Sequence, residues 1–173
     1  MMQVTARGSL ILGLLALLFW AGHAQAVPCQ NNIPASNPDA VYIDHGDGTV
    51  TDTRTDLMWK QCAEGLSGTN CQIGSAQNFT WANALARAKA STFANYADWR
   101  LPNVKELSSL VEECRWAPSI NTNRFPNTPS EPFWSGSPNA SSPKVWLVVN
   151  FDVGQVGRLF GSFSRVRLVR GGQ

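Results

Sequence analysis

The chain has 173 residues, with 14 Lys and Arg against 12 Asp and Glu, and four cysteines. This near-neutral charge gives no general case for a nucleic-acid partner or for an anionic membrane surface. The length, after a targeting segment is set aside, suits one domain with its own hydrophobic core.

The N-terminal residues are typical of a secretory signal peptide. Arg7 precedes an apolar run over residues 10–21, and Ala24-Gln25-Ala26 supplies a cleavage site of the A-x-A type. We expect residues 1–26 to be removed, leaving an exported chain in the periplasm or outside the cell, with no membrane span. Residues 27–39 are rich in Pro and Asn and are predicted to be extended, and residues 40–173 form the predicted domain.

Short β-prone runs follow, separated by turns that are rich in Gly and Asp. They predict a three-stranded meander over residues 41–45, 49–53 and 57–61. The acidic residues of this region lack the alternating spacing and the terminal glutamate of an EF-hand loop. We therefore assign Asp44, Asp47 and Asp52 to turn chemistry and not to calcium.

The first predicted helix spans "TWANALARAKA", residues 80–90. Thr80 is a suitable N-cap, and the alanines favour helix. Trp81, Leu85 and Ala88 share one face, which we expect to be buried.

The stretch "DWRLPNVKEL", residues 98–107, is predicted to be a strand-to-helix corner. Pro102 forces extended backbone on Leu101, and Asn103 with Glu106 matches a capping box at the start of a helix over residues 104–113. Trp99 and Leu101 should face one side, and Asp98 and Arg100 the other. No partner base or nucleophile accompanies the corner. We therefore assign a structural role to Trp99, Arg100, Pro102, Asn103 and Glu106.

The C-terminal third begins with a Pro-, Asn- and Ser-rich stretch over residues 115–144, which predicts a long packed loop. "KVWLVVNF" then predicts a buried strand, and a turn at residues 152–154 leads into the strand "QVGRLF". In the closing "SRVRLVRGG", apolar Val166 and Leu168 alternate with Arg165 and Arg167, which predicts a last strand.

All four cysteines follow the signal peptide, and an even number in an exported chain implies two disulfides. Of the three possible pairings we favour Cys62–Cys71, which flank a Gly-rich loop, and Cys29–Cys114. The second bridge would fasten the N-terminal segment to the end of a helix. No C-x-x-C spacing is present, so neither a redox motif nor a zinc site is indicated.

Catalytic motifs are scarce. His45 is the one histidine after the signal peptide, which excludes serine triads, cysteine–histidine pairs and multi-histidine zinc sites. Glu112, Glu113 and Glu131 are the carboxylates near the long loop, but adjacent helical glutamates point apart. We expect no enzyme activity, no catalytic residue, no metal and no other cofactor.

Two groups of residues suggest binding instead. Arg158, Arg165, Arg167 and Arg170 lie in a segment without an acid, and on antiparallel strands they would form a stripe for sulfate or carboxylate groups. The alternative is an ordinary solvated sheet face. Trp134, with Phe133, Ser135 and Asn139, would form a sugar-stacking platform, or the two aromatics would anchor the loop in the core.

Several blocks in this order resemble the bacterial Lcl C-terminal domain family, named after a collagen-like adhesin and long regarded as a domain of unknown function. The resemblance rests on "DGTVTDTRTDLMW", "TWANAL", "DWRLPNVKEL", "APSINTNRFPNT", "FWSGSP", "WLVVNFDVG" and "VRLVRGG". Asp56 stands where the family usually has Gly, and Asp tolerates the left-handed backbone that such a turn needs.

The resemblance implies an α+β, C-type-lectin-like single domain with short antiparallel strands, two helices and a long irregular loop region. It also implies adhesin-like binding of sulfated polysaccharides, and the adhesin is a trimer. We expect an exported, non-catalytic domain that binds an acidic or surface glycan, with a sulfated polysaccharide as the first candidate. The alternatives are a structural envelope module with a protein partner and, third, a hydrolase on the same scaffold.

Overall fold

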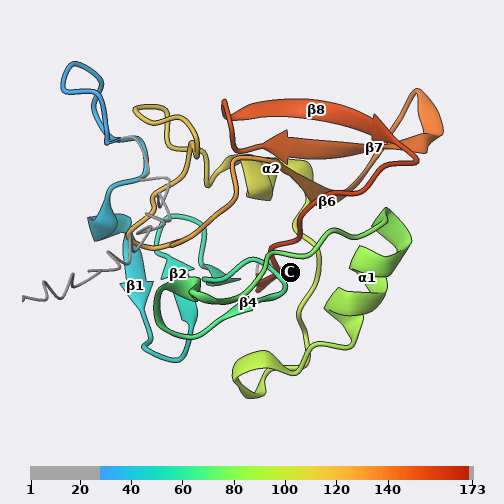
Figure 1. Cartoon of the computed structure of the whole chain (residues 1–173), viewed down its shortest axis with the longest axis horizontal. Helices are drawn as coiled ribbons and strands as arrows, with labels where there is room; N and C mark the ends of the chain where they lie inside the picture. The colour runs from blue at the N-terminus through green and yellow to red at the C-terminus, as the bar shows by residue number, and fades with distance from the viewer. Residues whose placement is uncertain (1–27, 172–173) are drawn as a thin grey trace, which may run out of the picture.

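The computed structural model describes residues 28–171, and the expected signal peptide over residues 1–26 lies outside the described residues. Within the described residues the fold is α+β, as predicted, with two α-helices and three small antiparallel sheets (Figure 1). Short 3-10 turns over Asp39–Val41, Thr69–Cys71 and Phe93–Asn95 connect these elements.

The first sheet contains the predicted meander. Its strands lie in the order β1 (Tyr42–Asp44), β2 (Thr49–Asp52), β3 (Leu57–Lys60) and β9 (Val169–Arg170). Turn chemistry closes the hairpins, because Asp47 accepts the backbone N–H of Thr49 at 2.9 Å and Asp56 adopts a φ of 54°. The last strand, β9, pairs with β3 and completes this sheet.

A second sheet, β4 (Leu66–Ser67) with β5 (Ile73–Gly74), forms a small flap closed by the Cys62–Cys71 disulfide. Gly65 has a φ of 94°, and a Cβ at this position would lie 2.3 Å from the backbone oxygen of Ser75. A side chain at this position is therefore excluded by both strain and contact.

The third sheet is β6 (Pro132–Asn139), β7 (Ser142–Asn150) and β8 (Gln155–Phe160). The prediction of a loop up to residue 144 is wrong here, because β6 and the start of β7 fall inside it. Pro132 and Pro138 suggested irregular backbone, but β6 is an edge strand, where a missing N–H is tolerated. The loop proper covers residues 115–131.

Helix α1 (Trp81–Lys89) begins as predicted, with the Thr80 hydroxyl accepting the N–H of Asn83 at 3.3 Å. Its buried residues are Ala84 and Ala88, whereas Leu85 is 38% exposed, so the predicted apolar face is wrong at Leu85. Small alanines let the helix approach the neighbouring strands closely, and Leu85 falls at the rim of this contact.

Helix α2 (Val104–Ser108) starts at the predicted capping box but ends at Ser108, not at residue 113. Beyond it, Val111 forms a bridge with Ile120, and the N–H of Glu112 donates to the Ser119 carbonyl at 3.0 Å. These long-range partners replace the helical hydrogen bonds that the apolar spacing predicts.

Two hydrophobic clusters lie on opposite faces of the third sheet. Phe133 and its cross-strand partner Val149 belong to one cluster, whereas the adjacent pair, Trp134 and Val148, belongs to the other. Because neighbouring residues of a strand point to opposite faces, the sheet lies between the two clusters. This arrangement fixes β6 and β7 firmly.

Both favoured disulfides, Cys29–Cys114 and Cys62–Cys71, are present. Cys114 does not end a helix as expected, since α2 stops earlier. Beside this bridge, the buried Glu112 carboxylate accepts the N–H groups of Ser36 and Asn37, each at 2.8 Å, and so fixes the N-terminal segment. No helix within residues 28–171 has the length and apolar character needed to span a bilayer.

Candidate functional site

The predicted corner has the geometry expected of a structural element. Arg100 donates from both terminal nitrogens to the two oxygens of Glu106, each at 2.8 Å, and Asn103 with Glu106 forms the capping box. Trp99 is 3% exposed, and its indole N–H donates to the Phe93 carbonyl at 2.9 Å. These contacts fix the chain direction between an extended segment and α2, and Pro102 is buried beside them.

The predicted arginine stripe does not exist as one surface. Arg158 is exposed on β8, whereas Arg165 pairs with Glu131 at 2.8 Å and Arg167 is 0% exposed. Arg170, in turn, pairs with Asp98 at 2.7 Å. The alternation of apolar and basic residues misled the prediction, because the chain around Val166–Val169 is covered on both sides.

Arg167 is instead a buried hydrogen-bond donor beside the hydrophobic cluster that contains Phe133. Its guanidinium donates to the carbonyl of Lys60 at 2.9 Å, to that of Gln61, and to the Thr128 hydroxyl at 2.7 Å. It also lies 4.8 Å from the centre of the Phe125 ring. Burial lowers the pKa of Arg167 to about 9, so the group is still charged at neutral pH.

Trp134 and Phe133 are both 0% exposed, so no sugar-stacking platform forms there. The Trp134 indole N–H donates to the Phe79 carbonyl at 2.7 Å, and the Ser135 hydroxyl donates to the Leu147 carbonyl at 2.7 Å. Asn139 lies apart, at the end of β6, where it pairs with Ser142 of β7. The alternative reading, aromatic anchors in the core, is the correct one.

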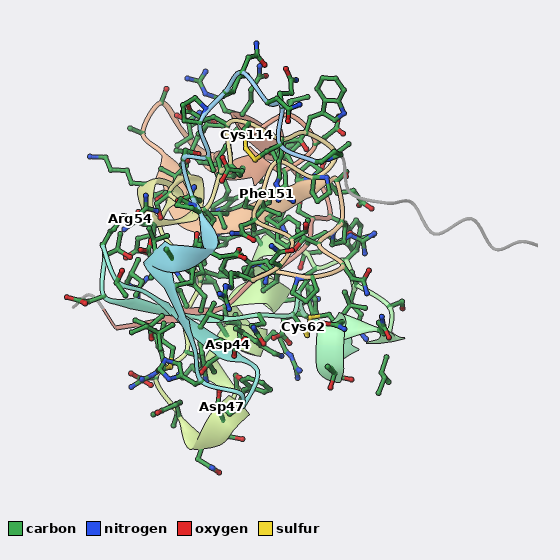
Figure 2. All side chains as sticks on the ribbon, turned by 90° about the vertical axis from the view of Figure 1, so that its left-hand side faces the viewer. Asp44, Asp47, Arg54, Cys62, Cys114 and Phe151 are labelled. Atoms are coloured by element: carbon green, nitrogen blue, oxygen red, sulfur yellow. A yellow bond between two sulfur atoms is a disulfide. The ribbon has the colours of Figure 1, made fainter. Side chains whose placement is uncertain are left out.

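A groove of about 680 Å³ lies at the end of the molecule away from Cys114. Figure 2 shows Asp44, Asp47 and Cys62 together at this end. Its walls come from the β1–β2 turn, the end of β3, the disulfide-closed flap, α1 and the loop around residue 123. Polar groups that line it include Asp44, Asp47, Gln61, Ser67, Asn70 and Asn123.

A charge cluster lies beside the groove, where Lys60 and Arg87 of the lining meet the buried Glu64. Glu64 is 1% exposed and accepts Lys60 Nζ at 2.7 Å and Arg87 Nε at 2.5 Å. Lys60 Nζ also lies 4.7 Å from the centre of the Phe93 ring, which forms part of the wall. Glu64 offsets one of these two positive charges, and Asp44 and Asp47 line the same groove, so the groove carries no excess of positive charge.

A second hollow of about 450 Å³ adjoins the first, and the two share Asn70, Asn123 and Pro126. It adds further amides, Gln72 and Asn127. The Asn127 side chain donates to the Asn70 carbonyl at 2.8 Å and so connects the long loop to the flap. The two hollows are therefore neighbours with shared lining residues, and together we call them the groove surface.

The sequence of the chain also matches a known protein family. A family model described as the Lcl C-terminal domain matches residues 48–170. The chain belongs to the Lcl C-terminal domain family. No curated protein matches the chain.

The Lcl C-terminal domain match covers β2 to β9 and with them most of the groove surface, although Asp44 and Asp47 lie just before it. Sequence reasoning missed this surface because its residues come from distant segments and carry no motif. The available signal was the Cys62–Cys71 pair, which fixes the flap beside the Gly- and Asp-rich turn.

No metal chemistry is indicated by the described part of this Lcl C-terminal domain. Within residues 28–171, the group of Cys, Asp, Glu or His close enough for a metal is Cys29, Glu112 and Cys114. The two sulfurs are joined to each other, and the Glu112 carboxylate already accepts several N–H groups. Such a set offers no free ligand atoms of the kind that zinc takes.

Proposed function

We propose that this protein is an exported, non-catalytic glycan-binding domain that holds hydroxyl-rich, uncharged sugar segments in the groove surface. The observation that carries the proposal is a pair of adjoining hollows, lined by amides and carboxylates, that share Asn70, Asn123 and Pro126. Amide and carboxylate groups on a fixed backbone can donate to and accept from sugar hydroxyls, and a trough accommodates a chain of several sugar units.

The charge distribution supports uncharged over sulfated sugars. Lys60 and Arg87 share the Glu64 carboxylate, and Arg124 lies 3.8 Å from Asp44, so each cation near the groove has an acid beside it. A sulfate would need cations that are free to form bidentate contacts. The predicted arginine stripe would have supplied them, but its members are separated, paired or buried.

The environment of the carboxylates supports a binding role without catalysis. Glu112 is buried among backbone N–H groups, and Glu131 pairs with Arg165 through two contacts, at 3.0 and 2.8 Å. Glycoside hydrolysis needs two carboxylates that flank an open site, one of them protonated as the general acid. Asp44 and Asp47 line the groove, but hydrogen bonds from Thr49 hold the pKa of Asp47 below its ordinary value, which disfavours Asp47 as that acid. The two disulfides, in turn, are typical of a compartment outside the cytoplasm, which supports export.

The test is an immobilised-glycan screen with neutral and sulfated polysaccharides, comparing the wild type with a Gln61→Ala/Asn123→Ala double variant. Each lost hydrogen bond contributes ~0.5–1.5 kcal/mol, so affinity for a bound neutral glycan should fall roughly tenfold. Asn78→Ala, which removes an exposed amide outside the groove, is the matched control and should bind like the wild type. Melting temperatures should stay nearly equal across the set.

Salt separates the two glycan classes. Binding of an uncharged sugar should be nearly independent of ionic strength, whereas contacts to sulfate weaken as salt screens them. The proposal is wrong if only sulfated polysaccharides bind, with a steep salt dependence and equal affinity for the groove double variant. It is also wrong if a bound neutral glycan is released as hydrolysed product.

A further inference from the structure

The two edges of the β6–β7–β8 sheet differ. The β6 edge is covered, because the N–H of Trp134 donates to the Arg165 carbonyl at 2.9 Å and the N–H of Gly136 to the Pro102 carbonyl at 2.7 Å. Two prolines and two register shifts interrupt it further. Natural proteins use such devices to prevent an edge strand from pairing with another chain.

The β8 edge has none of these devices. Its register with β7 runs without a shift from Val145↔Phe160 to Asn150↔Gln155, and the strand contains no Pro and no Lys. Among the described residues, no strand other than β7 pairs with β8, which lies outermost in the sheet (Figure 1). The backbone groups directed away from β7 are thus available to a further strand.

The side chains on one face of β8 give this edge a specific character. Val156 is 54% exposed and Phe160 67% exposed, and Arg158 lies between them on the same face. Arg158 forms no ion pair within residues 28–171, whereas Arg87, Arg165 and Arg170 each contact a carboxylate. The face therefore presents an apolar, a basic and an apolar residue in succession.

We propose that β8 binds an extended segment of another protein by strand addition, and that this segment carries an acidic residue between two apolar ones. Cross-strand pairs of opposite charge and of apolar residues both stabilise a sheet, so the acid would lie opposite Arg158. This site is separate from the groove surface, since no β8 residue lines either hollow.

Charge complementarity favours an acidic segment of another protein over two other possible partners of the β8 edge. A second copy paired antiparallel, with Val156 opposite Phe160, would bring the two Arg158 side chains face to face, which is unfavourable. The chain's own residues 1–27 contain no Asp or Glu and could not supply the acid. An acidic segment of another protein can both form backbone hydrogen bonds with β8 and place a negative charge opposite Arg158.

The test uses a pool of synthetic nonapeptides that alternate Thr with Val, Ile, Leu or Phe and carry Glu at the centre, and a matched pool with Lys. Binding to the protein purified from the periplasm is followed by amide chemical shifts. The Glu pool should bind roughly fivefold more tightly, and Arg158→Glu should reverse the preference, since a cross-strand charge pair contributes ~0.2–1 kcal/mol. Perturbed amides should map to residues 155–160.

Lys89→Glu, the reversal of an exposed charge on α1, is the matched control and should leave the peptide preference unchanged. The proposal is overturned if neither pool binds, or if Arg158→Glu keeps the wild-type preference. A concentration-dependent dimer that protects the β8 amides would also overturn it, because a second copy would then be the occupant. Groove variants serve as an independent check, since they should bind the Glu pool normally.

Discussion

The corner over residues 98–106 and the return segment over residues 164–170 lie side by side, yet each fixes its central arginine differently. Their backbones exchange two hydrogen bonds between Arg100 and Val169, at 2.9 and 3.1 Å. In the corner, Arg100 is neutralised by Glu106, six residues further along the chain. In the return segment, Arg167 has no acid and is fixed by carbonyls, a hydroxyl and aromatic rings.

The difference shows that an arginine can stabilise only the chain segment next to it or can connect segments that are distant in the sequence. Arg100 and Glu106 remain 25% and 15% exposed, so water still competes with their contact. The partners of Arg167 lie 39 to 107 residues away, and the Arg167 side chain itself is 0% exposed. We therefore expect Arg167 to support the whole domain and Arg100 mainly the start of α2.

The largest effect should come from Arg167→Met. The substitution keeps an apolar stem but leaves two buried carbonyls and the Thr128 hydroxyl without their donor, so we expect a loss of about 3–5 kcal/mol. Urea unfolding measures it, with the exposed Arg158→Gln as a control expected to stay within ~0.5 kcal/mol. Wild-type stability for Arg167→Met would mean that the cost of burying its charge cancels those bonds, and the contrast with Arg100 would fail.

Arg100→Ala should have a smaller effect, about 1–2 kcal/mol, because the pair is partly exposed. A double-mutant cycle with Glu106→Gln should assign roughly 1 kcal/mol to the contact itself. The readout is again urea unfolding. A loss as large as that of Arg167→Met would show that the corner, too, supports the whole domain.

The contribution of the Arg100–Glu106 pair should disappear in acid. Burial alone would raise the pKa of Glu106, but hydrogen bonds from Arg100 and from the Asn103 backbone, with the Arg100 charge, hold it below its ordinary value of 4.5. A carboxylate whose folded-state pKa is depressed stabilises the fold above its unfolded pKa and loses this as pH falls through the folded value. The difference in melting temperature between the wild type and Arg100→Ala should therefore narrow as the pH falls below the ordinary glutamate value of 4.5. A constant difference would assign the effect to packing.

The smallest effect should come from Arg170→Ala. Asp98 is solvent-exposed, so its contact with Arg170 is screened, although Arg170 also lies 3.8 Å from the centre of the Tyr96 ring. We expect a lower melting temperature, but a smaller change than for Arg100→Ala. Salt at about 0.5 M should reduce the charge-dependent part of the difference. If salt leaves the difference in melting temperature unchanged, the contact with the Tyr96 ring is the main contribution of Arg170.

Sequence reasoning succeeded where partners are close in the chain. The Asn103–Glu106 capping box, the Thr80 cap and the Asp47 turn each involve residues two or three positions apart. The geometry of these motifs depends on hydrogen bonds between neighbouring residues, so the local sequence is enough to predict it. For the same reason the meander and the start of both helices were predicted correctly.

Sequence reasoning failed where contacts between distant segments of the chain determine the structure. Helix α2 stops at Ser108 because residues 111 and 112 pair with residues 119 and 120, and Arg167 is buried because its acceptors arrive from β3 and the long loop. The groove surface has the same origin, since its walls come from several segments. Periodicity carries no information about such contacts. The C-type-lectin-like arrangement, which rested on family resemblance, stays a prediction.

The pairing of β9 with β3 has a consequence for biosynthesis. Trp59 on β3 lies opposite Val169, about 110 residues later (169 minus 59), so the first sheet stays incomplete until almost all of the chain has emerged. Until then, the free edge of β3 and the Trp59 ring, 0% exposed once the fold is complete, remain open to chaperones and proteases. A product of premature termination would keep this edge open permanently, so cellular quality control can distinguish finished from unfinished copies.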